Sequence, residues 1–137
     1  MVYGIYQTFL FLTGIGKMEF NKKNPPRNFQ VGIKKEITIK DCGTIKLNNN
    51  EQVTFLTEKL GEYDVARKSW GFYATPSMNG RLKNFGLRTA LVKNKIDLYY
   101  IMIVEEGCED EFFKYIEDES NEIITWLDTP ENINKKL

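Results

Sequence analysis

Histidine is absent from this chain of 137 residues, and cysteine occurs only twice. Without histidine, the chain cannot build a Ser-His-Asp or Cys-His catalytic arrangement, an HExxH motif or a Cys/His zinc site. Any general base must therefore be a carboxylate, lysine, tyrosine or cysteine. Cys42 and Cys108 lie far apart and form no CxxC motif. This spacing favours free thiols in a reducing, cytoplasmic compartment over a disulfide framework.

An excess of charge of one sign and a long apolar run are also missing. The chain has 19 basic and 19 acidic residues, so the molecule as a whole has no attraction to nucleic acid or to anionic membranes. The apolar stretch 2–15 is too short and interrupted for a spanning helix, and it lacks the features of a secretory signal. We expect residues 1–17 to be a peripheral apolar segment or an upstream extension, with neither a membrane nor nucleic acid as partner.

The remaining chain predicts one α+β domain. Residues 18–28 are polar and include two prolines, which predicts a linker. Residues 29–129 are long enough to bury one core, and residues 130–137 are expected to be a C-terminal tail. Apolar and polar residues alternate from Phe29 to Val65, with Tyr63 and Val65 among the apolar positions and turn residues at Asp41-Cys42-Gly43. This pattern is typical of an antiparallel sheet with one buried face, either a meander or an open sandwich.

A hairpin over residues 87–104 is expected at the centre of the sheet. Its second apolar run, Leu98 to Val104, is uninterrupted and rich in β-branched and aromatic residues. Such a run predicts a strand buried on both faces. Asn94 lies between the two runs and suits a turn position with positive φ.

Two short helices are predicted, near residues 76–85 and 109–119. Thr75 and Pro76 suit the N-cap and first position of the earlier helix, and Gly86 suits its left-handed cap. Residues 123–126 are predicted to form a last strand. The apolar positions expected to face inward are Met78, Leu82 and Phe85 in the first helix, and Phe112, Tyr115 and Ile116 in the second, with Phe113 as a further candidate.

Charge is divided sharply between two segments. Residues 67–95 hold seven basic residues and no acidic one, whereas residues 105–131 hold eleven acidic residues and one basic. One interpretation is that these segments face each other, or are solvated faces of different elements. The other is an anion site at the start of the 76–85 helix.

The predicted anion site combines backbone N–H groups with Ser77 and Asn79, while Arg81 or Arg88 adds bidentate contacts to a phosphate or carboxylate. Trp70 and Tyr73 precede the helix and are candidates for stacking on a base or sugar ring, with core packing as the alternative. No carboxylates have calcium-loop spacing, so we expect no metal and no cofactor.

Residues 68–86, KSWGFYATPSMNGRLKNFG, resemble small bacterial proteins of unknown function encoded in surface-polysaccharide gene neighbourhoods. The resemblance covers roughly residues 29–128 and implies no catalytic residue or ligand.

Three functions follow, in this order of preference. The first is a non-catalytic binding or accessory protein that recognises an anionic small molecule, such as a nucleotide or sugar phosphate, or a protein partner. The second is a structural or oligomer-forming module in which the charged segments pair between subunits, as in a homo-oligomer. The third is an enzyme using carboxylate, lysine or tyrosine chemistry. The absence of a nucleophile–base signature weighs against this third function.

Overall fold

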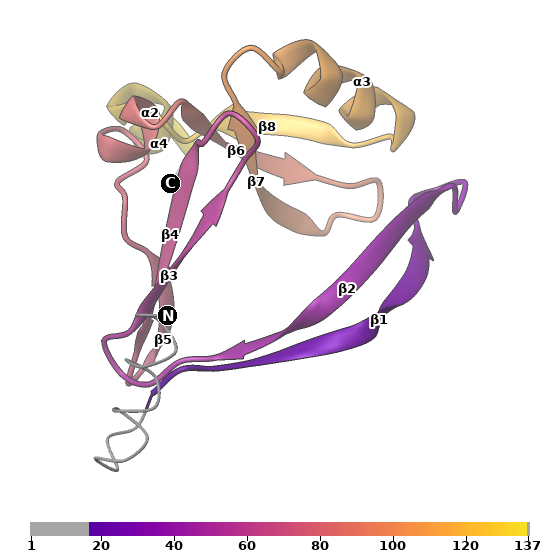
Figure 1. The fold of residues 1–137 in the computed structure, drawn as a ribbon. Helices are drawn as coiled ribbons and strands as arrows, with labels where there is room; N and C mark the ends of the chain where they lie inside the picture. The colour runs from indigo at the N-terminus through magenta and orange to yellow at the C-terminus, as the bar shows by residue number, and fades with distance from the viewer. Residues whose placement is uncertain (1–16, 137) are drawn as a thin grey trace. The chain divides into compact units, whose positions relative to one another are not determined.

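The computed structural model describes residues 17–136, which form an α+β fold made mostly of antiparallel strands (Figure 1). The predicted fold class is therefore confirmed. Almost all of the apolar segment predicted over residues 1–17 lies outside the described residues. The elements are β1 (Glu19–Val31), β2 (Ile37–Lys46), β3 (Gln52–Leu56), β4 (Glu62–Lys68), β5 (Gly71–Ala74), α2 (Arg81–Asn84), β6 (Leu87–Lys93), β7 (Tyr99–Glu105), α3 (Glu109–Asp118), β8 (Glu122–Trp126) and α4 (Pro130–Lys136).

The strands form three sheets, with the orders β1-β2, β3-β4-β5 and β7-β6-β8. Contacts between residues divide the described chain into two compact units where the sequence predicts one domain. The first unit comprises residues 17–53 and 66–73, and the second comprises residues 54–65 and 74–136.

Strand β1 occupies residues that the sequence predicts as a linker. Phe20 pairs with Ile45 and Phe29 pairs with Ile39, on either side of an irregularity in register between Lys22 and Arg27. Both prolines fall inside this irregularity, where a residue without an N–H group breaks no regular ladder bond. The polar, proline-bearing composition therefore marks a bulge in a long hairpin rather than a linker.

The turn predicted at Asp41-Cys42-Gly43 is likewise part of a strand, β2. Gly43 is needed there because β1 approaches closely: a Cβ atom at this position would lie 2.5 Å from the carbonyl oxygen of Asn21. The glycine marks close strand contact and not a change of direction.

The hairpin predicted over residues 87–104 is confirmed, but its place in the sheet differs. β6 pairs with β7 on one side and β8 on the other, so β6 is central and β7 is an edge strand. Tyr99, Tyr100 and Ile101 are exposed, not buried on both faces. At the turn, Asp97 has the positive φ, while the Asn94 side-chain oxygen accepts N–H bonds from Ile96 and Leu98. An apolar run indicates a strand without showing how many neighbours that strand has.

Helix α3 covers one face of this sheet, and strand β8 forms as predicted (Figure 1). Ile116 and Phe112 pack with Ala90 and Val92 in the core, whereas Phe113 and Tyr115 are exposed. Fewer side chains of α3 therefore pack in the core than the sequence predicts. Residues 130–136 form helix α4, in place of the predicted tail.

The helix predicted over residues 76–85 is shorter, extending only from Arg81 to Asn84. Thr75 does not cap it, because the helix begins at Arg81 and Gly80 occupies the N-cap position. The predicted role of Gly86 is confirmed, since it has a φ of 76° just after the helix. Leu82 is almost fully buried, in agreement with the predicted apolar stripe.

Candidate functional site

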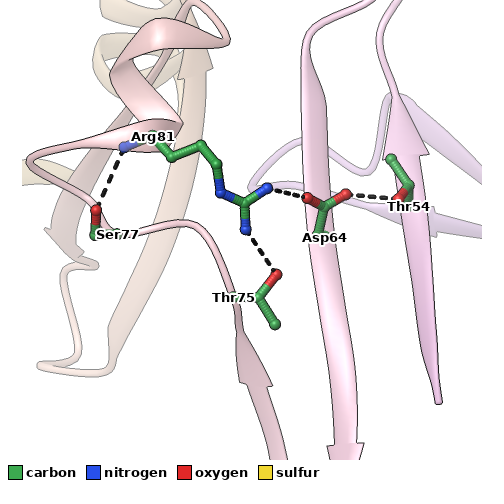
Figure 2. A network of polar contacts seen from close by, with 5 residues as sticks. All are labelled: Thr54, Asp64, Thr75, Ser77 and Arg81. Carbon is green, nitrogen blue, oxygen red and sulfur yellow. Dashed lines mark hydrogen bonds and ion pairs between the residues drawn. The ribbon is translucent and has the colours of Figure 1, made fainter. Parts of the chain in front are cut away.

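Asp64 is the centre of a polar network within the second unit (Figure 2). Its side chain is almost fully buried, although the sequence predicts Tyr63 and Val65 as the apolar positions of this strand. Asp64 Oδ2 accepts a hydrogen bond from Arg81 Nη1 at 2.8 Å, and Oδ1 accepts one from the Thr54 hydroxyl at 2.5 Å. Arg81 Nη2 also donates to the Thr75 hydroxyl at 3.2 Å. The network therefore connects β4 to β3 and to the residues that follow β5.

This network compensates the buried negative charge of Asp64. A buried carboxylate requires a partner of opposite charge, and the guanidinium supplies it with good hydrogen-bond geometry. The same guanidinium lies 5.4 Å from the centre of the Phe85 ring. About half of the Arg81 side chain remains exposed, but its principal partner is internal.

Backbone N–H groups at the start of α2 also have protein partners. Gly80 and Leu82 donate to the carbonyl of Ser77, and Lys83 donates to the carbonyl of Gly80. The Ser77 hydroxyl accepts from the N–H of Arg81 at 3.3 Å, so the structure brings these two predicted residues together. Asn79, two residues before Arg81 in the sequence, is exposed to solvent. A four-residue helix whose first donors are already bonded offers little to a bound anion.

Arg88 is also held by a buried carboxylate. Its Nε donates to Asp128 Oδ2 at 2.8 Å, and its guanidinium lies 3.9 Å from the centre of the Trp126 ring. Asp128 is only 2% exposed. The arginine thus combines a charge-assisted hydrogen bond with a cation–π contact.

The two charged segments meet at two points within the second unit. One is the ion pair between Arg88 and Asp128, and the other is between Lys93 Nζ and Glu122 Oε1, which are 3.8 Å apart. These contacts support the interpretation that the basic and acidic segments face each other.

Trp70 and Tyr73 belong to the first unit, and their ring centres are 5.9 Å apart. Trp70 is 69% exposed and Tyr73 is 46% exposed. The rings therefore do not pack in a core, which was the alternative role considered for them.

The free edge of β7 is the feature that sequence reasoning missed. Asn94 donates its N–H to Leu98, and Glu106 donates its N–H to Gly86; both pairs continue the β6–β7 register. Bonded and non-bonded pairs alternate in an antiparallel ladder. The backbone groups of Tyr100, Met102 and Val104 therefore point toward β6. Those of the alternate residues, Tyr99, Ile101, Ile103 and Glu105, point away from it.

This edge is also strongly apolar. Tyr99 is 60% exposed and Ile101 is 54% exposed, and the preceding turn adds exposed Ile96 and Leu98. The strand contains no proline and no charge before Glu105. Proteins usually protect such an edge with lysine, proline, a bulge or a covering element. Among residues 17–136, β6 is the only strand paired with β7.

Within the described part of the chain, no three acidic or cysteine side chains are grouped so as to hold a metal ion. None of the helices in residues 17–136 is both long enough and apolar enough to cross a bilayer. Burial raises the pKa of Tyr63 on β4 above its usual value, which keeps its phenol neutral.

Comparison of the chain with protein-family models, curated proteins and solved structures finds no match.

Proposed function

We propose that this chain is a non-catalytic interaction module that binds a protein partner by adding a strand to the free edge of β7. The observation that carries the proposal is the combination of unpaired backbone groups and exposed apolar side chains along one strand. In strand addition, main-chain hydrogen bonds provide affinity and alternate side chains provide specificity. β7 has both kinds of group available at Ile101 and its neighbours.

The internal pairing of the two arginines supports this function over anion binding at residues 77–88. Arg81 and Arg88 each face an almost fully buried aspartate. A ligand that drew either guanidinium away from its aspartate would leave a carboxylate buried without its charge partner, which is costly. The free edge of β7 can be used without breaking any such interaction.

A peptide that resembles no segment of this chain tests the proposal. The probe is a seven-residue peptide of alternating valine and threonine, with blocked ends and a terminal lysine for solubility. We expect it to slow hydrogen exchange at the amides of Tyr99, Ile101 and Ile103, measured by NMR on the chain diluted until it is monomeric. The amides of Tyr100 and Met102, which face β6, should change little. The same peptide with a central proline is the control. Equal exchange at the outward amides with and without the first peptide contradicts the proposal.

A ring-bearing anion, such as a nucleotide or a sugar phosphate, is a second candidate ligand. The exposed Trp70–Tyr73 pair favours it, because aromatic faces stack on bases and sugar rings. We expect adenosine diphosphate to quench the fluorescence of the protein, and Trp70→Phe to abolish this quenching. Trp126→Phe is the matched control, since Trp126 packs against the core. Equal quenching in the Trp70→Phe variant excludes this site.

We also propose a cytoplasmic setting in a bacterial cell. The free thiols of Cys42 and Cys108 support a reducing compartment. The resemblance of residues 68–86 supports a bacterial source.

A further inference from the structure

We infer that the partner strand is β7 of a second copy of this chain, paired antiparallel about a two-fold axis at Met102. This inference rests on the proposed function, because it assigns the occupant of the same free edge. Closed two-fold dimers are the commonest protein oligomers, and their interface must be complementary to itself. Both the hydrogen-bonding pattern and the charges at the ends of β7 meet this requirement.

The outward backbone groups define which registers allow hydrogen bonds. With the axis at Met102, Ile101 of each copy lies opposite Ile103 of the other. All of these residues point their N–H and C=O groups outward, so each pair exchanges two hydrogen bonds. Tyr99 then lies opposite Glu105, whose N–H also points outward. The Glu105 carbonyl already accepts the N–H of Cys108 at 3.0 Å, so the ladder ends there.

Moving the axis toward the N-terminus of β7 gives less favourable registers. Moving the axis to Ile101 brings Asp97, in the turn before β7, close to Glu105 of the other copy, and like charges held close together are destabilising. Moving it to Tyr100 places Ile103 opposite Asp97, which lies in the turn before β7 and outside the strand. The axis at Met102 avoids both arrangements.

The two ends of β7 have opposite charge. Before the strand, Lys93 at the end of β6 pairs with Asp97 at 3.5 Å, which leaves Lys95 as the basic residue of the turn. Residues 105–111 carry five carboxylates and no basic residue. Antiparallel pairing puts the basic turn of one copy beside the acidic end of the other. It also keeps the two acidic ends apart. This arrangement gives the segregated charge a role between subunits, in addition to the internal Arg88–Asp128 pair.

Mass measurement tests the dimer directly. We expect light scattering of the full chain to show twice the 16.0 kDa of one copy as concentration rises. Ile101→Pro removes an outward N–H that β6 does not use, and should weaken the dimer by roughly a hundredfold because paired backbone groups are lost. Ile101→Val retains the N–H and should preserve the dimer. A strictly monomeric wild-type chain overturns the inference.

Crosslinking tests the register even if the proline variant folds poorly. In a Cys42→Ser, Cys108→Ser background, Met102→Cys should form an intermolecular disulfide, because facing non-bonded residues have Cα atoms about 4.5 Å apart. Ile101→Cys should crosslink much less, because residue 101 of one copy and residue 101 of the other are diagonal neighbours, roughly 7–8 Å apart. Preferential crosslinking through Ile101→Cys overturns the register. If the valine–threonine peptide protects β7 while the chain stays monomeric and uncrosslinked, self-pairing fails but strand addition stands. If the peptide also fails to slow hydrogen exchange at the outward amides of β7, both proposals are contradicted.

Discussion

Arg88 donates from Nε to Asp128 Oδ2 at 2.8 Å, across 40 positions of sequence. The carboxylate is 2% exposed, and its second oxygen, Oδ1, has no hydrogen-bond partner among the described residues. Among the described residues, the buried charge of Asp128 is therefore compensated by a single arginine. Its contact with the Trp126 ring holds the guanidinium in place while the carboxylate is shielded from water.

Replacing Arg88 should be strongly destabilising. Arg88→Ala leaves the Asp128 carboxylate buried without a partner, and we expect the free energy of unfolding to fall by about 3–5 kcal/mol. Urea denaturation followed by circular dichroism measures this change. Lys83→Ala, an exposed substitution in α2, is the control and should change stability by less than about 0.5 kcal/mol. A similarly small effect for Arg88→Ala contradicts the structural role.

Arg81→Ala should cost less than Arg88→Ala. Asp64 keeps the hydrogen bond from the Thr54 hydroxyl, and the Arg81 side chain is about half exposed. We expect a loss of roughly 1–3 kcal/mol, measured by the same denaturation experiment. Lys83→Ala, at an exposed position of the same helix, should have little effect. If the two variants are equally stable, Arg81 is a surface residue without a structural role and remains available to a ligand.

Leu60→Gly should stabilise the protein. Leu60 has a φ of 65° and is 71% exposed, so its side chain provides little packing while its backbone is in the left-handed region. Glycine removes that strain, and its greater freedom in the unfolded chain offsets part of the gain; we expect a net increase of roughly 0.5 kcal/mol in the free energy of unfolding. Lys59→Gly is the control, because Lys59 has no positive φ and should lose stability. A lower melting temperature for Leu60→Gly contradicts this account.

The carboxyl group of Asp41 should titrate below the usual range for aspartate. The hydrogen bond from Lys23 lowers its pKa most, and the Gly43 N–H and the charges of Lys23 and Arg27 lower it further. Because the pKa is lower in the folded hairpin, the contribution to stability is present above the ordinary aspartate pKa. It is lost as pH falls through the folded value.

An NMR titration of the Asp41 carboxyl carbon checks this direction. Lys23→Met should raise the titration midpoint, because the leading hydrogen bond is lost. Lys40→Met, at an exposed neighbouring position, should leave it unchanged. An unaltered midpoint in the Lys23 variant shows that the pairing does not persist in solution.

Local pattern predicts much of the secondary structure but not the burial of particular residues. Alternation identifies β4 as a strand, yet the buried positions are Asp64 and Ala66 rather than Tyr63 and Val65. An aspartate on the buried face becomes favourable only because Arg81, 17 residues away, and Thr54 reach it. A pattern based on side-chain polarity cannot include a partner that only the folded chain brings near.

Local sequence patterns predict the α+β class, the β6–β7 hairpin, helix α3 and the segregation of charge, because these depend on residues close together in the chain. The folded chain alone shows that the apolar strand β7 lies at an edge, and that Arg81 and Arg88 pair with Asp64 and Asp128. Strand order and ion pairing depend on which distant segments meet. That choice is set by packing of the whole chain, which local periodicity does not encode.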